Sequence, residues 1–326
     1  MSDRLTPVVR LAPAKLNLTL SVVGRRPDGF HALHSVIAPL RLYDRLSLAP
    51  ATGQVDTLHV TGADTGPADE NLVLRAIAAA RLAAAEAHGR GAPTGPLAAR
   101  LEKHIPVAAG LAGGSSDAAA ALDAALDAWS LEVAPEARAR VAAGLGSDVP
   151  FFLAGGPALV EGRGEQVTPL PAISGTAPGV LLVTPAAAIR TADAFAAFDA
   201  GGPAAPADPR STRISSEHLV SELRGGLSGH DLVVRGGVLA ATNDLAAAAF
   251  HLVPGLLQLR RRMSRLLGVS IGLSGSGPTL WALYPSLDGA REAAGALEGA
   301  FRRRDLEAPG SGAPFVIAIE LGGPPE

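Results

Sequence analysis

The sequence has no cysteine, and this absence excludes several kinds of chemistry at once. In a chain of 326 residues without a thiol there can be no disulfide bond, thiolate metal site or cysteine nucleophile. The N-terminal segment lacks the apolar stretch of a signal peptide. No apolar run reaches the roughly 20 residues that a membrane-spanning helix requires. We therefore expect a cytoplasmic protein with no membrane partner.

Lysine is nearly absent as well. Of the 28 basic residues, only Lys15 and Lys103 are lysine and the rest are arginine. Arginine evidently serves wherever any positive charge suffices, so these two positions suggest a need for a compact ammonium group on a flexible stem. The alternative is that two surface lysines survive by chance. The formal net charge of −3 gives no bulk attraction to nucleic acid, which we do not expect as a partner.

Strand-like and helix-like segments alternate along the chain. Strands are expected at residues 8–23, 33–48, 97–105, 151–169, 179–184, 270–284 and 314–320, and helices at residues 71–88, 115–129, 136–145, 243–250, 255–267 and 288–304. A stretch rich in proline and glycine, residues 169–178, separates two expected domains, 1–170 and 178–326. This interleaving predicts a two-domain α+β fold. Residues 199–213, rich in glycine, proline and alanine, are expected to form a mobile loop.

The strongest local signal is a run of small residues before the alanine-rich helix. Residues 106–117 read Pro-Val-Ala-Ala-Gly-Leu-Ala-Gly-Gly-Ser-Ser-Asp. Small side chains let backbone N–H groups approach an anion closely, and the start of the following helix adds free N–H groups and a positive dipole end. The pattern therefore favours a phosphate-binding loop. The alternative is an ordinary alanine and glycine loop with a serine that caps the helix.

Three further segments could carry chemistry. Asp148 lies in a tight turn before a proline and two phenylalanines, where it could act as a general base, although the residues alone favour an Asx-turn. Lys15 and Asn17 point to the same side of a predicted strand, and a buried lysine there requires an anion. A second glycine cluster, residues 272–279, is a weak signal by itself but could close over a triphosphate together with the first loop.

Taken together, these segments resemble the GHMP kinase superfamily. Its three signatures occur in order: the segment around Lys15, the glycine loop at 110–117 and the late glycine loop at 272–277. Within the superfamily the chain is most similar to the diphosphocytidyl-methylerythritol kinases. That similarity lies in residues 12–18, 24–31, 33–35, 70–73, 146–151, 161–165 and 243–245. Mevalonate or homoserine kinases would not be expected to carry segment 26–31 in this form.

The resemblance implies a two-domain GHMP fold and an ATP-dependent kinase, with Mg²⁺ carried by the nucleotide and no metal site of its own. It implies that Asp148 takes the proton from the 2-hydroxyl of the cytidyl substrate, that Lys15 pairs with Asp148 and stabilises the alkoxide and the γ-phosphoryl group, and that Asn17 orients the hydroxyl. Phe30 and His31 would recognise the cytosine, with Phe195 as a second stacking face.

The resemblance also implies an ATP site. Asn71, Leu72 and Lys103 would lie near the adenine. The phosphates would be held by Pro106, Val107, Ala108, Ala109, Gly110, Leu111, Ala112, Gly113, Gly114, Ser115 and Ser116, with Ser274, Gly275, Ser276 and Gly277 in the late loop.

The chain departs from the family pattern at three places, of which one, residues 201–213, resembles an insertion with no implied role. Ala108, Ala109 and Ala112 stand where relatives often have glycine, and their methyl groups are tolerable only if φ stays negative. Phe30 stands where tyrosine is common, so stacking is kept and a hydroxyl contact is lost.

Two other functions stay open: another GHMP kinase acting on homoserine, a sugar or a mevalonate compound, and a nucleotide-binding member without catalysis. The sequence leaves monomer and homodimer undecided.

Overall fold

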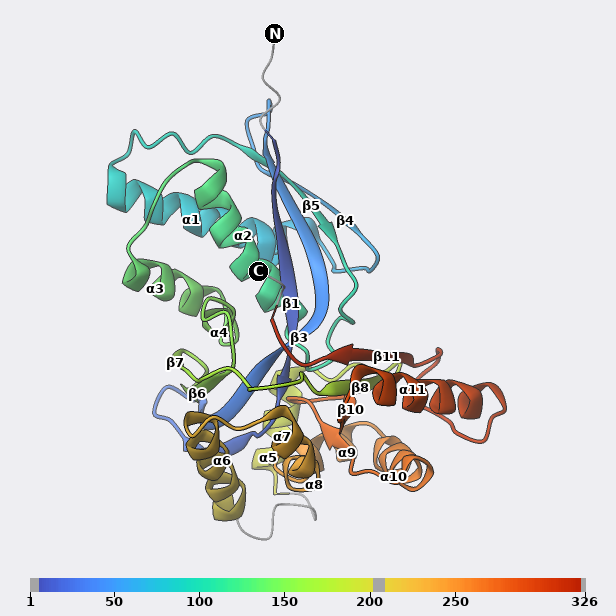
Figure 1. Ribbon diagram of the computed structural model, residues 1–326. Coiled ribbons are helices and arrows are strands. Elements are labelled where there is room, and N and C mark those ends of the chain that lie inside the picture. Colours follow the sequence, from blue (N-terminus) through green and yellow to red (C-terminus); the bar gives the residue numbers. More distant parts are fainter. Residues whose placement is uncertain (1–5, 202–208, 324–326) are drawn as a thin grey trace.

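The first half of the chain is built on one seven-stranded sheet. The computed structural model describes residues 6–201 and 209–323. The strands of this sheet are β1 (Val8–Asn17), β2 (Ser21–Arg25), β3 (His31–Pro50), β4 (Thr57–Thr61), β5 (Leu97–Glu102), β6 (Ala158–Gly162) and β7 (Gln166–Pro169). β3 pairs antiparallel with β1, β2, β5 and β6 along its 20 residues. Figure 1 shows β1 and β3 running together as the longest strands of the molecule.

Four helices lie on one side of this sheet (Figure 1). They are α1 (Leu72–His88), preceded by the short 3₁₀ helix η1 (Ala68–Glu70), α2 (Gly113–Ala128), α3 (Pro135–Leu145) and α4 (Val149–Phe152). The facing sides of α1 and α2 are mostly alanine, with Ala76, Ala80, Ala121 and Ala125 all fully buried. Small side chains allow the two helices to pack closely, which fixes the start of α2 against the sheet.

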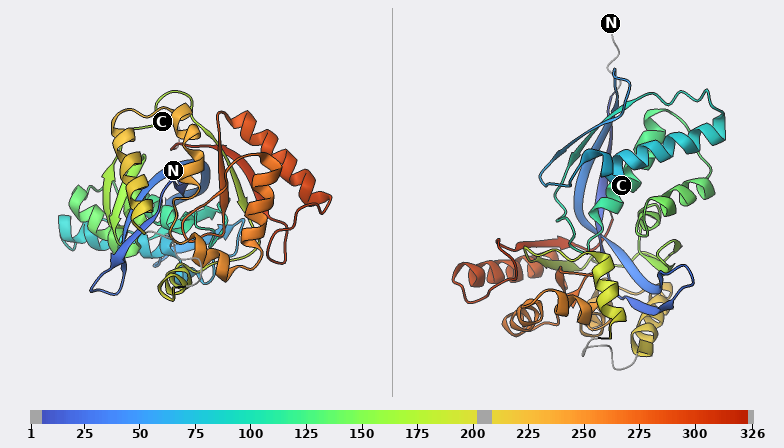
Figure 2. Two further views of the ribbon diagram at one scale, coloured as in Figure 1. Left: turned by 90° about the horizontal axis from the view of Figure 1, so that it is seen from below. Right: turned by 180° about the vertical axis from the view of Figure 1, so that it is seen from behind.

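The second half contains a four-stranded antiparallel sheet in the order β11-β8-β10-β9. Its strands are β8 (Gly179–Thr184), β9 (Gly272–Leu273), β10 (Leu280–Tyr284) and β11 (Phe315–Glu320). The helices are α5 (Thr191–Asp199), α6 (Pro209–Arg224), α7 (Gly229–Val234), α8 (Gly236–Leu239), α9 (Ala246–Leu252), α10 (Leu256–Leu267) and α11 (Leu287–Arg302). Both views in Figure 2 place α10 and α11 beside this sheet, at the opposite end of the molecule from α1.

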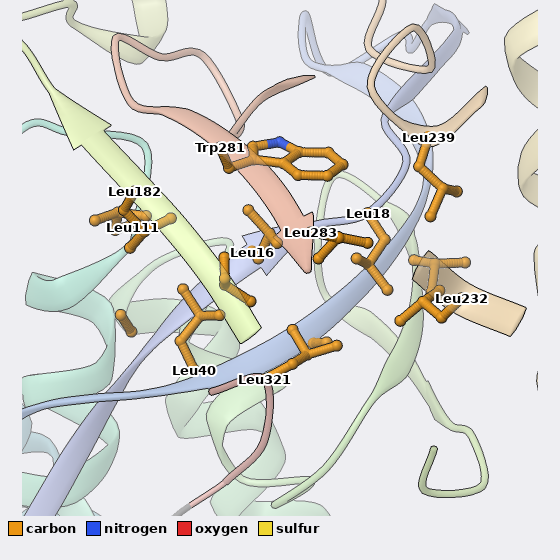
Figure 3. Packing of buried hydrophobic residues seen from close by; sticks show 14 of the residues in the cluster. Leu16, Leu18, Leu40, Leu111, Leu182, Leu232, Leu239, Trp281, Leu283 and Leu321 are labelled. Carbon is orange, nitrogen blue, oxygen red and sulfur yellow. The ribbon is translucent and has the colours of Figure 1, made fainter. Parts of the chain in front are cut away.

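The two sheets share a hydrophobic core, because β8 is buried on both faces. Leu181 and Val183 pack with the helices α9, α10 and α11, whereas Val180 and Leu182 face the other way. On that other side lies the shared core, which contains Leu16 of β1, Leu18 directly after β1, Leu40 of β3, Leu182 of β8, Trp281 of β10 and Leu321. Figure 3 shows these side chains converging from strands of both halves. This core fixes β1 between the two sheets, and with it the predicted site residues Lys15 and Asn17.

The observed elements differ from the expected ones mainly in the second half. The prediction of a mobile loop at residues 199–213 is wrong for residues 209–213, because α6 already begins at Pro209. Residues 202–208 of that predicted loop lie outside the described residues. Proline suits this position, since its missing N–H has no partner in a first helical turn. The short elements β4, α5, α7 and α8 have no counterpart in the sequence-based expectation.

The sheets change at the expected boundary, between the end of β7 and the start of β8. The division into domains 1–170 and 178–326 nevertheless stays a prediction, because α6 packs on β2 and β3 of the first sheet. Within residues 6–201 and 209–323, no helix combines the length and the apolar character needed to cross a membrane.

Packing around Trp281 gives a test of the shared core. A Cβ atom at Gly272 would lie 2.3 Å from Cε2 of the Trp281 indole, which is only 1% exposed. We expect Gly272→Ala to lower the free energy of unfolding by about 1–3 kcal/mol, because the indole must shift. Gly295→Ala is the matched control, since a Cβ there meets nothing within 4 Å and alanine favours the helix by about 1 kcal/mol. Urea denaturation followed by circular dichroism measures both, and a Gly272→Ala variant as stable as the parent would contradict this packing.

Candidate active site

The loop between β5 and α2 has a left-handed backbone at three positions. Ala108 has a φ of 53°, Gly110 of 75° and Ala112 of 54°. The expectation of a negative φ is therefore wrong for Ala108 and Ala112 but not for Ala109, and the left-handed conformation costs an alanine about 1–2 kcal/mol. Alternation of right- and left-handed residues turns successive N–H groups toward one concave side, which is the geometry of an anion-binding nest.

The helix α2 begins directly after this loop without a capping side chain. Its N-cap residue is Ala112, so no side chain occupies the first N–H groups. The N–H groups of Gly113, Gly114 and Ser115 have no carbonyl partner within the helix and are available to an anion. The alternative of a serine-capped loop is wrong, because Ser115 and Ser116 lie inside the helix.

The late glycine loop is bound to the first loop, as expected. The Ser274 hydroxyl donates a hydrogen bond to the carbonyl oxygen of Gly110 at 3.0 Å. A Cβ atom on Gly110 would lie 2.3 Å from the carbonyl oxygen of Ser274, so only glycine permits this approach. Asn243 holds the late loop from behind, where its amide donates to the carbonyls of Leu273 and Gly275 at 2.9 Å each.

The two loops and the start of α1 enclose a cavity of about 390 Å³, here called the loop cavity. The residues expected at a nucleotide line it, apart from Leu111 and Ser116: Asn71, Leu72, Lys103, Pro106, Val107, Ala108, Ala109, Gly110, Ala112, Gly113, Gly114 and Ser115. Leu111 belongs to the shared core, and Ser116 is 1% exposed inside α2. Of the late loop, Ser276 lines this cavity, Ser274 bonds to Gly110, Gly275 lines a second cavity described below, and Gly277 lines neither. The remaining lining residues are Lys15, Thr65, Glu70, Asp117, Asp148, Ile189 and Thr191.

Lys103 lies in a buried cluster of charges beneath the start of α2. Its ammonium group donates to Asp44 and, at 2.6 Å, to Asp117. The second oxygen of Asp44 accepts the backbone N–H groups of His104 and Ile105 at 2.5 and 2.9 Å. Burial, opposed by the charge of Lys103, raises the pKa of Asp117 to about 7. Lys103 lines the loop cavity, but its expected contact with adenine stays a prediction.

A second cavity, about 480 Å³, lies on the other side of Lys15 and is here called the aromatic cavity. The four residues expected to bind the acceptor, Asn17, Phe30, His31 and Phe195, all line it. The rings of His31 and Phe195 stack with centroids 4.8 Å apart and planes 16° apart. Nε2 of His31 also lies 2.7 Å from a carboxylate oxygen of Asp199. Phe30 is 49% exposed and is covered by the guanidinium group of Arg163, 5.1 Å from the ring centroid.

Lys15 and Asp148 line both cavities, together with Thr191. The expected direct pair between them does not form: among the described ion pairs none joins Lys15 to Asp148, and Lys15 Nζ instead donates to Oδ1 of Asn17 at 2.5 Å. Burial lowers the pKa of Lys15, and the nearby charge of Asp148 opposes that shift. The Asx-turn alternative for Asp148 is wrong as well. Although Asp148 precedes α4, its carboxylate makes no capping hydrogen bond, so it stays free at the junction of the cavities.

Several residues of the site are absent from the sequence-based prediction. Asp44 and Asp117 pair with Lys103, and a signal for them existed, since a lysine at a buried position requires carboxylates. Arg163, which lines the aromatic cavity, lies in segment 161–165 that carries the family resemblance, whereas Asp199 lines it without any pattern that distinguishes it from a surface charge. Ser35, which accepts a hydrogen bond from the Asn17 amide at 2.9 Å, lies in a segment that carries the family resemblance.

Comparison with known proteins supports the resemblance. A model of the GHMP kinases N-terminal domain matches residues 71–156. A 4-diphosphocytidyl-2-C-methyl-D-erythritol kinase from Pelotomaculum thermopropionicum is 36% identical over 301 residues, which cover 91% of this chain and 95% of that protein. A protein of the same name from Nocardia farcinica is 38% identical over 325 residues and 97% of both chains.

Solved structures agree with this assignment. A crystal structure of 4-(cytidine 5'-diphospho)-2C-methyl-D-erythritol kinase is 35% identical and has a TM-score of 0.68. The match covers 97% of this chain and 100% of that chain. Homoserine kinase from Cytophaga hutchinsonii, 17% identical with a TM-score of 0.68 and coverage of 99% and 98%, shares the fold. The predicted α+β GHMP fold is thus confirmed, and the chain belongs to the 4-diphosphocytidyl-2-C-methyl-D-erythritol kinase family of GHMP kinases.

Proposed function

We propose that this protein transfers the γ-phosphoryl group of ATP to the 2-hydroxyl of 4-diphosphocytidyl-2-C-methyl-D-erythritol, as a step of non-mevalonate isoprenoid synthesis. The observation that carries the proposal is that two cavities meet at Lys15 and Asp148. The loop cavity offers unpaired N–H groups to a triphosphate, and the aromatic cavity offers rings to a cytosine. A kinase must bring its two substrates together at one point, and this junction is that point.

The chemistry at the junction needs few groups. Asp148 takes the proton from the acceptor hydroxyl, the alkoxide oxygen forms a bond to the γ-phosphorus, and the bond to the β-phosphate oxygen breaks to release ADP. The Lys15 ammonium offsets the charge on the transferring group, and Asn17 orients the hydroxyl. Mg²⁺ would be held mainly by the nucleotide phosphates and would neutralise further phosphate charge.

The loop cavity suits this ligand because of its backbone. The uncapped start of α2 and the left-handed turns at Ala108, Gly110 and Ala112 aim N–H groups at a polyanion. The adenine would lie against Asn71 and Leu72, at the end of the cavity nearest α1.

The aromatic cavity suits a cytidine diphosphate compound. His31 and Phe195 already stack on each other, and a cytosine can take the place of one ring in such a stack. Arg25 and Arg163 line the same cavity and supply positive charge for a diphosphate.

Other GHMP acceptors such as homoserine, a sugar or a mevalonate compound would leave these aromatic and basic groups without a partner. A binding-only member of the fold would not require a free carboxylate beside a buried ammonium. A cytoplasmic location, the absence of a nucleic-acid partner and the choice between monomer and homodimer stay predictions.

Asp148→Asn tests the general base. With Mg-ATP and the cytidyl substrate, ADP release should fall about 100-fold or more, because the amide cannot accept the proton. The KM for Mg-ATP should change little, since the carboxylate makes no hydrogen bond that shapes the loop cavity. Asp288→Asn on the exposed start of α11 is the control and should keep full activity. Activity retained by Asp148→Asn would mean that the base is another group.

Phe195→Ala tests the acceptor. Stacking of a base on an aromatic ring is worth about 1–3 kcal/mol, so the KM for the cytidyl substrate should rise about tenfold or more while the KM for Mg-ATP stays constant. Phe250→Ala is the control, because this ring contacts Arg260 and is not among the residues that line either cavity. An equal rise in both KM values, or efficient turnover of a non-cytidyl alcohol by the parent, would refute the proposed acceptor.

A further inference from the structure

Behind Lys15 lies a short chain of buried hydrogen bonds that the mechanism above does not use. Asn17 Nδ2 donates to Oγ of Ser35 at 2.9 Å, and that hydroxyl donates to the backbone carbonyl of Thr19 at 2.5 Å. Asn17, Ser35 and Thr19 are 5%, 1% and 0% exposed. The three residues are thus buried, with Asn17 and Ser35 in the wall of the aromatic cavity.

The last acceptor fixes the direction of every bond in the chain. A carbonyl oxygen can only accept, so the single hydroxyl proton of Ser35 is committed to Thr19. Ser35 Oγ must then accept from Asn17, which directs the NH₂ group of that amide toward Ser35 and its oxygen toward Lys15. With the amide turned over, two N–H donors would face the Lys15 ammonium.

We propose that Ser35 is a positioning residue that sets the orientation of the Asn17 amide and thereby keeps Lys15 charged. Burial already lowers the pKa of Lys15, and the charge of Asp148 opposes this shift. The Asn17 amide oxygen accepts the hydrogen bond of the buried ammonium at 2.5 Å. Loss of Ser35 frees the amide to turn, which removes the one acceptor that the described residues offer to the ammonium. The kinetic consequence rests on the proposed function, but the charge of Lys15 does not.

The electrostatic surroundings of Lys15 are otherwise set by the walls of the two cavities. Asp148, in the turn before α4, supplies the opposing charge. More distant charged or titratable groups are Arg25, His31, Arg163 and Asp199 in the aromatic cavity and Glu70, Lys103 and Asp117 in the loop cavity. Ser35→Ala changes none of these groups, so a change in Lys15 titration reports on the amide.

The composition of the chain makes a direct measurement feasible. Because Lys15 and Lys103 are the only lysines, protein labelled with ¹³C in lysine shows side-chain signals from two residues, and Lys15→Arg assigns them. In an NMR titration, Ser35→Ala should move the midpoint of Lys15 to lower pH, and Ser35→Thr, which keeps the hydroxyl, should restore it. Ser216→Ala is the matched control: it removes the partner of the Thr19 hydroxyl at 2.7 Å but leaves the Thr19 carbonyl and Ser35 in place.

Kinetics give a second readout of the same variants. In Ser35→Ala, kcat should fall about tenfold and its alkaline limb should move to lower pH, while the KM for Mg-ATP stays constant. An unchanged Lys15 midpoint in Ser35→Ala, or an equal shift in Ser216→Ala, would overturn the proposal. If the parent failed to phosphorylate the cytidyl substrate, the proposed function would fall, and the NMR titration would still decide the role of Ser35.

Discussion

The burial of one ammonium group between two cavities is the constraint around which this site is organised. Removing a charged lysine from water is costly unless other groups replace its solvation. Lys15 meets this cost with an amide oxygen at 2.5 Å and a carboxylate at longer range. This division leaves Asp148 free of a direct ion pair. A carboxylate in a direct ion pair with the ammonium would have been a weaker base. The hydrogen bond of Lys15 to Asn17 therefore leaves Asp148 able to act as the base.

The second buried lysine, unlike Lys15, forms direct ion pairs with carboxylates. Lys103 donates to two carboxylates, Asp44 and Asp117, and the cluster ties β3 to the N-terminal part of α2. This cluster lies beneath the loop cavity, which Lys103 also lines. The strained alanines at 108 and 112 are held by this cluster and by the late glycine loop. Backbone strain of this kind persists only where the surroundings fix it, and here it turns N–H groups into the cavity.

Much of the site follows from the sequence, because its signals are local. The two lone lysines, the glycine loops and the aspartate before Pro150 are each visible within a few residues, and the alternating pattern of Leu16 and Leu18 predicts the strand that carries Lys15. The rest depends on contacts between distant segments. Asp44 and Lys103 are 59 positions apart, and the sign of φ at Ala108 is imposed by its neighbours in space. The sequence does not predict the helix α6, because most of its residues are polar and only a few apolar ones contact the shared core.

The core shared by the two sheets also bears on how the enzyme turns over. Leu16, Leu18 and Leu40 pack directly on Leu182 and Trp281, so rotation of one half against the other would expose apolar surface that is now buried. The shared core therefore opposes a hinge motion between the two halves. Substrates must enter and products leave through local motions, such as separation of the His31 and Phe195 rings. Turnover would then be limited by side-chain and loop gating, and the catalytic groups would keep one geometry throughout the cycle.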